Sequence, residues 1–333
     1  MRLGCEVAKW RSGAGFVLML LLLLQAAFVV DRGETAVDEE RPYAVHLPIV
    51  ADGREPPKSG IAFSSHRDAQ ERVDLLEGTV HYWRGWQVGN SLPGDRWGLE
   101  FTPSLWCDFY WHRQHSQGMF RPQMQVLDLL GPDYDGYLLF LNEPDLAYYG
   151  MSGQCAMSPR QAAHMYVHIK SFMPKVKLVG PGISHVDYLN GYRWLGEWFD
   201  FVVHYTGETP QMHAWDVHTY LRTGPPLAPY DALQAWLAAR GVYDPIFWIT
   251  EYGSCDPHRL RYMMDSFEAD PRIRRYYIYE QFGATWDGDG RCILLFYEDE
   301  RPIKLTLLGR VFVRGLAALG ERTAAGWQQP VMD

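Results

Sequence analysis

Short apolar runs alternate with segments of helical periodicity along most of the chain. Runs that are apolar at successive positions are typical of strands buried on both faces, as in a parallel sheet covered by helices. The predicted strands are 60–64, 79–86, 99–106, the run ending at Glu143, 175–180, 212–220, the run ending at Glu251, and 276–279. The predicted helices are 67–76, 124–130, 159–173, 192–204, 228–240, a segment after Pro257 and one beginning near 305–310.

This alternation predicts an α/β fold, specifically a (β/α)8 TIM barrel. The last strand is ambiguous, because residues 292–297 are also strand-like and could form a return hairpin. With 333 residues, 47% of them hydrophobic, the chain can bury a large core. We therefore expect one barrel domain over residues 59–325.

The amino-terminal segment has the pattern of an export signal. Arg2, Lys9 and Arg11 precede a run over residues 14–30 that is apolar except for Gln25. A basic region followed by an apolar stretch is typical of a signal peptide, but this stretch approaches the length of a spanning helix. Residues 1–30 are thus predicted to be a signal peptide or an N-terminal membrane anchor, with a linker over 31–58.

The charge of the chain and its export signal indicate which partners it can have and where it is located. The net charge of -9 disfavours nucleic acid as a partner. Export predicts a protein that is secreted, or membrane-anchored outside the cytoplasm with residues 14–30 as its tether.

In the oxidising environment outside the cytoplasm, the four cysteines after the apolar run form an even set that could pair, and all are expected in loops after strands. Of the three connectivities, Cys107–Cys155 and Cys255–Cys292 join adjacent loops and are favoured.

Two of the predicted strands end in a glutamate. Glu143 follows five apolar residues within Asn142-Glu143-Pro144, and Glu251 follows an apolar run within Thr250-Glu251-Tyr252. The loops after the strands build the active site of a parallel barrel, so both carboxylates would meet at one mouth. Paired carboxylates of this kind indicate glycoside hydrolysis. The alternative is that each glutamate caps the helix that follows it.

The two motifs resemble the acid/base and nucleophile signatures of clan A glycoside hydrolases. Within that clan the chain is most similar to glycoside hydrolase family 128, whose members include β-1,3-glucanases. Further matching segments are Phe101–Trp106, Asn142–Asp145 with Met157-Ser158-Pro159, and Val217–Tyr220. The resemblance covers roughly residues 59–315 and implies a single catalytic barrel. One departure is Tyr82–Trp86, where the family usually has a Tyr-Asn-Trp-like segment.

The resemblance implies a role for each matching residue. Glu143 would be the acid/base and Glu251 the nucleophile of a retaining enzyme. Asn142 would bind the 2-hydroxyl of the sugar, and His218 and Tyr220 would hold Glu251 ionised. The resemblance also places Trp106 at the sugar site.

Aromatic rings stack well on the flat C–H faces of sugars, so Trp86, Trp106 and Trp286 are candidate platforms, with barrel-top packing as the alternative for each.

No cofactor or metal is expected, because the sequence has no phosphate-binding glycine loop and no zinc-ligand spacing. The expected partner is a polysaccharide or oligosaccharide. We favour a β-1,3-linked glucan, while mannan or xylan hydrolysis and a non-catalytic carbohydrate-binding barrel stay open.

Overall fold

The computed structural model describes the parts of the chain that carry the predicted fold. These are residues 58–63, 69–76, 78–85, 99–105, 107–112, 117–122, 124–149, 155, 157–184, 189–220, 224–279, 283–284, 291–292, 295–297 and 304–324. The predicted signal or anchor (1–30) and all of the predicted linker before Lys58 lie outside them.

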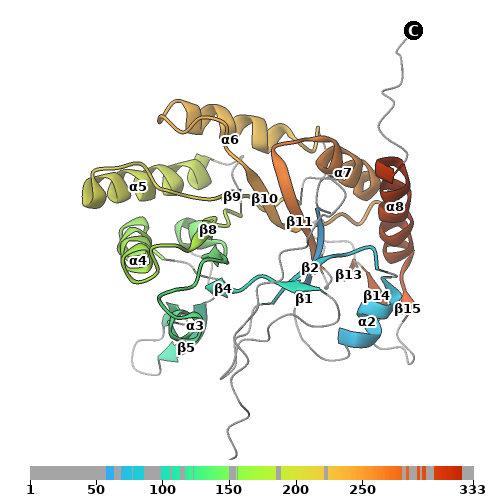
Figure 1. Ribbon diagram of the computed structural model, residues 1–333, viewed down its shortest axis with the longest axis horizontal. Coiled ribbons are helices and arrows are strands. Elements are labelled where there is room, and N and C mark those ends of the chain that lie inside the picture. The colour runs from blue at the N-terminus through green and yellow to red at the C-terminus, as the bar shows by residue number, and fades with distance from the viewer. Residues whose placement is uncertain are drawn as a thin grey trace, which may run out of the picture. The chain divides into compact units, whose positions relative to one another are not determined.

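Strands and helices alternate as predicted (Figure 1). The strands are β1 (Ser59–Phe63), β2 (Tyr82–Gly85), β3 (Glu100–Phe101), β4 (Ser104–Leu105), β5 (Cys107–His112), β6 (Gln117–Pro122), β7 (Tyr137–Phe140), β8 (Lys177–Val179), β9 (Trp215–Asp216), β10 (Phe247–Tyr252), β11 (Ile273–Tyr279), β12 (Gly283–Ala284), β13 (Arg291–Cys292), β14 (Phe296–Tyr297) and β15 (Lys304–Leu305). The helices are α2 (Ala69–Leu75), α3 (Gln125–Leu130), the 3-10 helix η1 (Pro144–Tyr149), α4 (Pro159–Phe172), α5 (Leu189–Thr206), α6 (Ala228–Ala238), α7 (Pro257–Ala269) and α8 (Leu307–Ala324).

The main strands pair in parallel. One sheet has the order β3-β2-β1-β11-β10-β9 and a second has the order β4-β7-β8. Parallel bridges at Val179–Ala214 and Ile183–Val217 connect the β8 side of the second sheet to the β9 side of the first. The predicted α/β class with parallel sheets is therefore confirmed.

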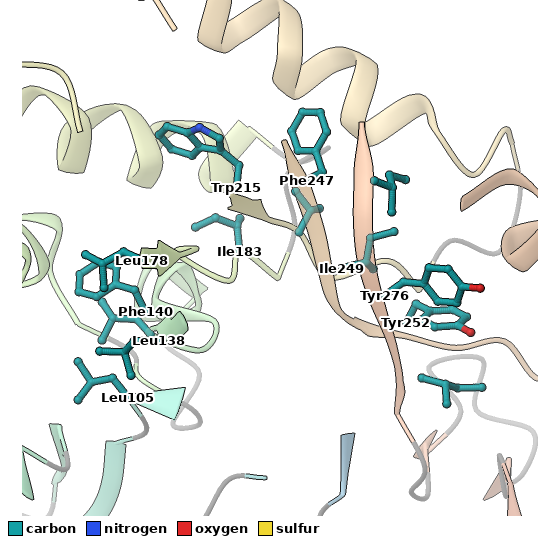
Figure 2. Packing of buried hydrophobic residues seen from close by; sticks show 14 of the residues in the cluster. Leu105, Leu138, Phe140, Leu178, Ile183, Trp215, Phe247, Ile249, Tyr252 and Tyr276 are labelled. Atoms are coloured by element: carbon teal, nitrogen blue, oxygen red, sulfur yellow. The ribbon is translucent and has the colours of Figure 1, made fainter. Parts of the chain in front are cut away.

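One face of these strands packs against the helices. Figure 2 shows this layer, to which Leu138 and Phe140 of β7, Leu178 of β8, and Phe247 and Ile249 of β10 contribute. All five side chains are fully buried. Large aromatic rings from the helices complete the layer, among them Trp198 of α5, whose ring lies near those of Phe140, Tyr166, Trp194 and Trp215.

The layer against the helices is the outer cluster. The alternate residues of the same strands face away from the helices, on the inner face, and form a second, inner cluster. Its members, one from each of seven strand segments, are Ala62, Tyr82, Leu139, Val179, Ala214, Trp248 and Tyr277. Every one of them is at most 3% exposed. Because side chains alternate between the two faces of a strand, the same runs fill both clusters, which explains why they are apolar at consecutive positions.

Helix α4 begins as its sequence predicts. Ser158 accepts a hydrogen bond from the backbone N–H of Gln161, whose side chain in turn accepts from the backbone N–H of Ser158, and Pro159 occupies the first turn. This capping box satisfies donors that the first helical turn leaves free. Helix α7 is capped by Asp256 rather than by Glu251.

The structure also corrects several boundaries. The predicted strand 99–106 is two short strands separated by Thr102 and Pro103, and the antiparallel pair β5–β6 was not predicted. Predicted strand 212–220 pairs regularly only at β9 and continues through single bridges. Residues 276–279 belong to β11, which pairs with β1 and β10, whereas β13 and β14 lie in separate antiparallel pairs. Among the described helices, none combines the length and apolarity needed to cross a membrane.

Cys155 and Cys255 are each disulfide-bonded. The Cys155 sulfur lies 3.8 Å from the carbonyl oxygen of Leu105, two residues before Cys107. This position favours the predicted Cys107–Cys155 pair. We therefore expect peptide mapping without reduction to recover Cys107–Cys155 and Cys255–Cys292, and a peptide linking Cys155 to Cys255 or Cys292 would contradict the prediction.

The buried aromatic layer gives a stability test. Trp198→Ala is expected to lower the free energy of unfolding by about 3–5 kcal/mol, because it leaves a cavity among four aromatic rings. Tyr243 is 74% exposed, so Tyr243→Ala should change it by no more than about 0.5 kcal/mol. Denaturant unfolding of both variants measures the difference, and equal effects would show that Trp198 does not carry the packing.

Candidate active site

Glu143 reaches the inner face of the strands through an irregular chain segment. Beyond β7, Leu141 has φ 59° and Glu143 has φ 48°, left-handed values that residues other than glycine rarely adopt. The backbone N–H of Glu143 donates to the Gly182 carbonyl at 2.7 Å, which holds the segment in place. Such strain costs on the order of 1–3 kcal/mol per residue and is typical of functional sites. Its effect here is that Asn142 and Glu143, consecutive in sequence, both contact residues of the inner face.

Glu251 reaches the same face through a break in strand pairing. The register between β10 and β11 shifts between Ile249 and Tyr252. A regular strand would place Thr250 and Glu251 on opposite faces, whereas here both side chains contact His218 or its neighbours and Tyr252 packs in the outer cluster. Bulges next to active sites commonly redirect a side chain in this way.

His218 connects the two glutamates. Its Nδ1 lies 2.9 Å from Glu143 Oε1 and 3.5 Å from Glu251 Oε2, and its ring is fully buried. On the other side of the ring, Nε2 lies 3.2 Å from the hydroxyl oxygen of Thr250. The structure thus brings together Glu143, Glu251 and His218, all three predicted from sequence.

Arg84 is a site residue that the sequence analysis did not identify. Its Nη2 donates to Asn142 Oδ1 at 2.9 Å and lies 3.4 Å from Glu251 Oε1, while Nη1 donates to the Thr250 carbonyl at 3.3 Å. The residue is only 1% exposed. Its signal in the sequence is an arginine inside an otherwise aromatic strand, which predicts a buried cation with an acidic partner.

Asn142 and Tyr220 complete the predicted set within the described residues. Asn142 is 3% exposed and its side-chain oxygen is occupied by Arg84. Tyr220 donates its hydroxyl proton to Glu251 Oε2 at 3.0 Å while the residue as a whole stays 40% exposed. The Glu143 side chain is 14% exposed and that of Glu251 only 6%, so Glu143 is the more accessible carboxylate. The candidate platforms Trp86, Trp106 and Trp286 lie outside the described residues.

Charges in the site strongly affect one another. Burial lowers the pKa of His218, but Glu251, Glu143 and Asp216 together raise it to about 9, so the imidazole is a cation at neutral pH. Burial raises the pKa of Glu251, with His218, Arg84 and Tyr220 opposing it and Glu143 adding to it. His218 and Tyr220 therefore favour the ionised form of Glu251, but burial and Glu143 outweigh them, and the net direction of the Glu251 pKa is upward. Burial of the Tyr220 hydroxyl and the carboxylates around it raise the pKa of Tyr220, which keeps it a donor.

The same three side chains could also present ligands to a metal ion. One donor atom each of Glu143, His218 and Glu251 lie within 4.8 Å of one another, and no other described group of histidine, cysteine and acidic residues converges in this way. However, Arg84 places a fixed positive charge 3.4 Å from Glu251. That charge disfavours a cation at this position, and the arrangement suits proton transfer better.

Comparisons with known proteins show the family of the chain and the likeness of its fold. Residues 60–309 match the family described as glycosyl hydrolase catalytic core. No curated protein sequence matches the chain significantly. Among solved structures, the endo-β-1,3-glucanase of subgroup II of family GH128 from Pseudomonas viridiflava is 20% identical, with a TM-score of 0.52 over 78% of this chain and 98% of that one.

Two other structures represent different members of GH128. An endo-β-1,3-glucanase of subgroup I from Amycolatopsis mediterranei, in complex with laminaritriose, is 17% identical, with a TM-score of 0.50 over 78% of this chain and all of that one. A subgroup VII oligosaccharide-binding protein from Cryptococcus neoformans is 14% identical, with a TM-score of 0.53 over 78% of this chain and 94% of that one. The chain belongs to the glycosyl hydrolase catalytic core family, and its fold is similar to the folds of GH128 proteins, the family that its sequence motifs resemble.

Proposed function

We propose that this protein is a retaining β-glycoside hydrolase that cleaves a β-1,3-linked glucan. The observation that carries the proposal is the convergence of Glu143 and Glu251, with nearest oxygens within 4.8 Å, around one buried histidine. Retaining enzymes hold their two carboxyl groups about 5–5.5 Å apart, so that the second attacks the sugar directly. The spacing here is compatible with direct attack.

In the first step, Glu251 would attack the anomeric carbon while Glu143 gives its proton to the leaving glycosidic oxygen. In the second step, Glu143 would take a proton from water as that water attacks the same carbon and releases Glu251. The exposures support this assignment, because the acid/base must meet both leaving group and water and Glu143 is the more accessible carboxylate. Tyr220 and Arg84 lie beside Glu251, where they would stabilise the carboxylate when it leaves the sugar.

We further propose that the eight parallel strand segments close into a (β/α)8 barrel. The bridges at Val179–Ala214 and Ile183–Val217 link one end of each sheet, and only Thr102 and Pro103 separate β3 from β4 at the other ends. The inner cluster takes side chains from both sheets, as the packed interior of a barrel requires.

The substrate assignment rests on similarity. Two of the similar structures are described as endo-β-1,3-glucanases, one of them in complex with laminaritriose. The likeness to a GH128 oligosaccharide-binding protein makes carbohydrate binding without hydrolysis the second candidate function. The disulfides at Cys155 and Cys255 support export to an oxidising compartment, as a secreted protein or one tethered through residues 14–30.

Substitution of the two glutamates tests the proposed mechanism. The protein is expected to release reducing sugar from laminarin but not from mannan, xylan or cellulose. Glu251→Gln should abolish release from every substrate, because no covalent intermediate can form. Glu143→Gln should lower kcat on laminarin by about 10²–10⁴-fold, the usual contribution of general acid–base catalysis. On an aryl glucoside, whose leaving group needs no proton, Glu143→Gln should lower kcat/KM far less, because kcat/KM reports the first step and not the attack of water in the second.

Each outcome distinguishes the candidates. Hydrolysis of mannan or xylan instead of laminarin would retain the mechanism and reject the substrate. Product of inverted anomeric configuration, read by proton NMR, would reject double displacement. Laminari-oligosaccharide binding without hydrolysis, unchanged in Glu251→Gln, would favour the binding protein.

Substitution of Arg84 tests its contact with Glu251 separately. Arg84→Met removes the cation beside Glu251 and leaves buried polar groups without their donor, so we expect it to lower the free energy of unfolding by about 3–5 kcal/mol. It should also lower hydrolysis, because Glu251 would hold its proton more tightly. Arg193→Met is the matched control: its pair with Glu197 is exposed, at 69% and 42%, and should contribute no more than about 1 kcal/mol. Equal effects of the two substitutions on unfolding would contradict the role given to Arg84.

A further inference from the structure

Asp216 is a third carboxylate in the site, and double displacement has no use for it. It ends β9, is 4% exposed, and both of its oxygens accept hydrogen bonds from Thr250. Oδ1 accepts from the Thr250 backbone N–H at 3.0 Å, and Oδ2 lies 2.6 Å from the Thr250 hydroxyl. A separation this short between hydroxyl and carboxyl oxygens is typical of a hydroxyl that donates to an ionised carboxylate. Burial raises the pKa of Asp216, while His218, the two hydrogen bonds from Thr250 and Arg84 favour its ionised form.

The direction of that hydrogen bond fixes the next one. A threonine hydroxyl has one proton, and Thr250 gives it to Asp216. The hydroxyl oxygen can then only accept from His218 Nε2, 3.2 Å away. As long as Thr250 donates to Asp216, His218 must carry a proton on Nε2, whether its ring is neutral or charged. Nδ1 is then the nitrogen that gains and loses a proton.

Nδ1 is the nitrogen that faces the two glutamates, at 2.9 Å from Glu143 Oε1 and 3.5 Å from Glu251 Oε2. The charged and titratable groups around the ring are these glutamates, Asp216 of the same strand segment, Arg84 of β2 and the Tyr220 hydroxyl. A proton on Nδ1 binds a carboxylate oxygen of Glu143, whereas a bare Nδ1 can accept a proton from it. The state of this nitrogen thus bears directly on the proton that Glu143 must deliver.

The packing leaves little freedom for another arrangement. The backbone at Gly182 packs directly against Asp216 and His218. A Cβ atom there would lie 2.8 Å from Asp216 Oδ2 and 3.2 Å from His218 Nε2, so a residue with a side chain would not fit. Asp216 also accepts the backbone N–H of Thr250 and so ties β9 to β10. A purely structural role for Asp216 would be limited to that tie.

We propose that Asp216 is a positioning residue that acts through Thr250. It turns the Thr250 hydroxyl so that His218 keeps its Nε2 proton and presents Nδ1 to Glu143 and Glu251 as the site of proton exchange. Its kinetic consequence rests on the proposed hydrolase function, but the order of the hydrogen bonds is a property of the free protein and can be tested without substrate.

The test is Asp216→Asn. The amide oxygen of the new side chain can still accept the Thr250 N–H, but its NH2 group donates to the Thr250 hydroxyl oxygen. The hydroxyl proton must then point to His218 Nε2, so the neutral ring would carry its proton on Nδ1. We expect nitrogen NMR of histidine-labelled protein, above the His218 pKa of about 9, to show a bare Nδ1 in the original protein and a bare Nε2 in Asp216→Asn. The His218 signals are identified by their loss in His218→Gln.

Three further variants complete the experiment. Asp200→Asn, an exposed position on α5, is the matched control and should leave the His218 signals unchanged. Thr250→Ser keeps a hydroxyl and should keep the original pattern. Thr250→Val has none, and His218 should titrate at lower pH, because its Nε2 proton loses its acceptor; this variant provides the test if Asp216→Asn does not fold.

Activity supplies the second readout. If laminarin is hydrolysed, the alkaline limb of the kcat/KM profile should move in Asp216→Asn and Thr250→Val but not in Thr250→Ser. An unchanged His218 tautomer in Asp216→Asn together with an unchanged His218 titration in Thr250→Val would overturn the proposal and leave Asp216 a structural tie. A changed tautomer in a protein that hydrolyses none of the glycans would reject the proposed function while supporting the positioning role.

Discussion

The site depends on placing two carboxylates close together in a buried position without separating the strands that carry them. Like charges at this distance repel, and burial adds the cost of removing each from water. The structure compensates with Arg84 beside Glu251 and the protonated ring of His218 between both glutamates. Each of these four groups comes from a different strand or the turn that follows it. Correct pairing of β2, β7, β9 and β10 is therefore a condition for the charges to balance.

Regular strands would not produce this arrangement. Side chains from Ala214 to Tyr220 alternate strictly, so Asp216, His218 and Tyr220 share the inner face. The glutamates need departures from that alternation, namely left-handed backbone at Leu141 and Glu143 and the register shift before Tyr252. The inner cluster below provides the rigid base against which these irregular ends are held.

The sequence predicted what depends on local patterns. Strand-end glutamates were visible because apolar runs stop at Glu143 and Glu251, and α4 was placed by Ser158 and Pro159. An arginine in an aromatic strand indicates a buried cation but does not show its partners, and Arg84 was missed because Asn142 and Glu251 lie far along the chain. The antiparallel pair β5–β6 was missed because apolar and polar residues do not alternate regularly along these two segments, so the sequence has no strand period there. Register shifts and left-handed residues depend on tertiary contacts, so the direction of each glutamate could not be read from its position alone.

The charged arrangement also bears on the choice between hydrolysis and binding. A neutral glucan can be held by hydroxyl-directed hydrogen bonds and aromatic stacking, neither of which needs coupled carboxylates. Here the buried core of the site contains Glu251, Asp216, His218 and Arg84, whose desolvation is costly and is compensated only by their mutual contacts. Such a set gives little advantage to a binding protein, because the sugar carries no charge to meet it. It is of use when charge develops during a reaction, as it does when the glycosidic bond breaks and a proton must move. The energetic cost of the site therefore favours the hydrolase over the binding protein.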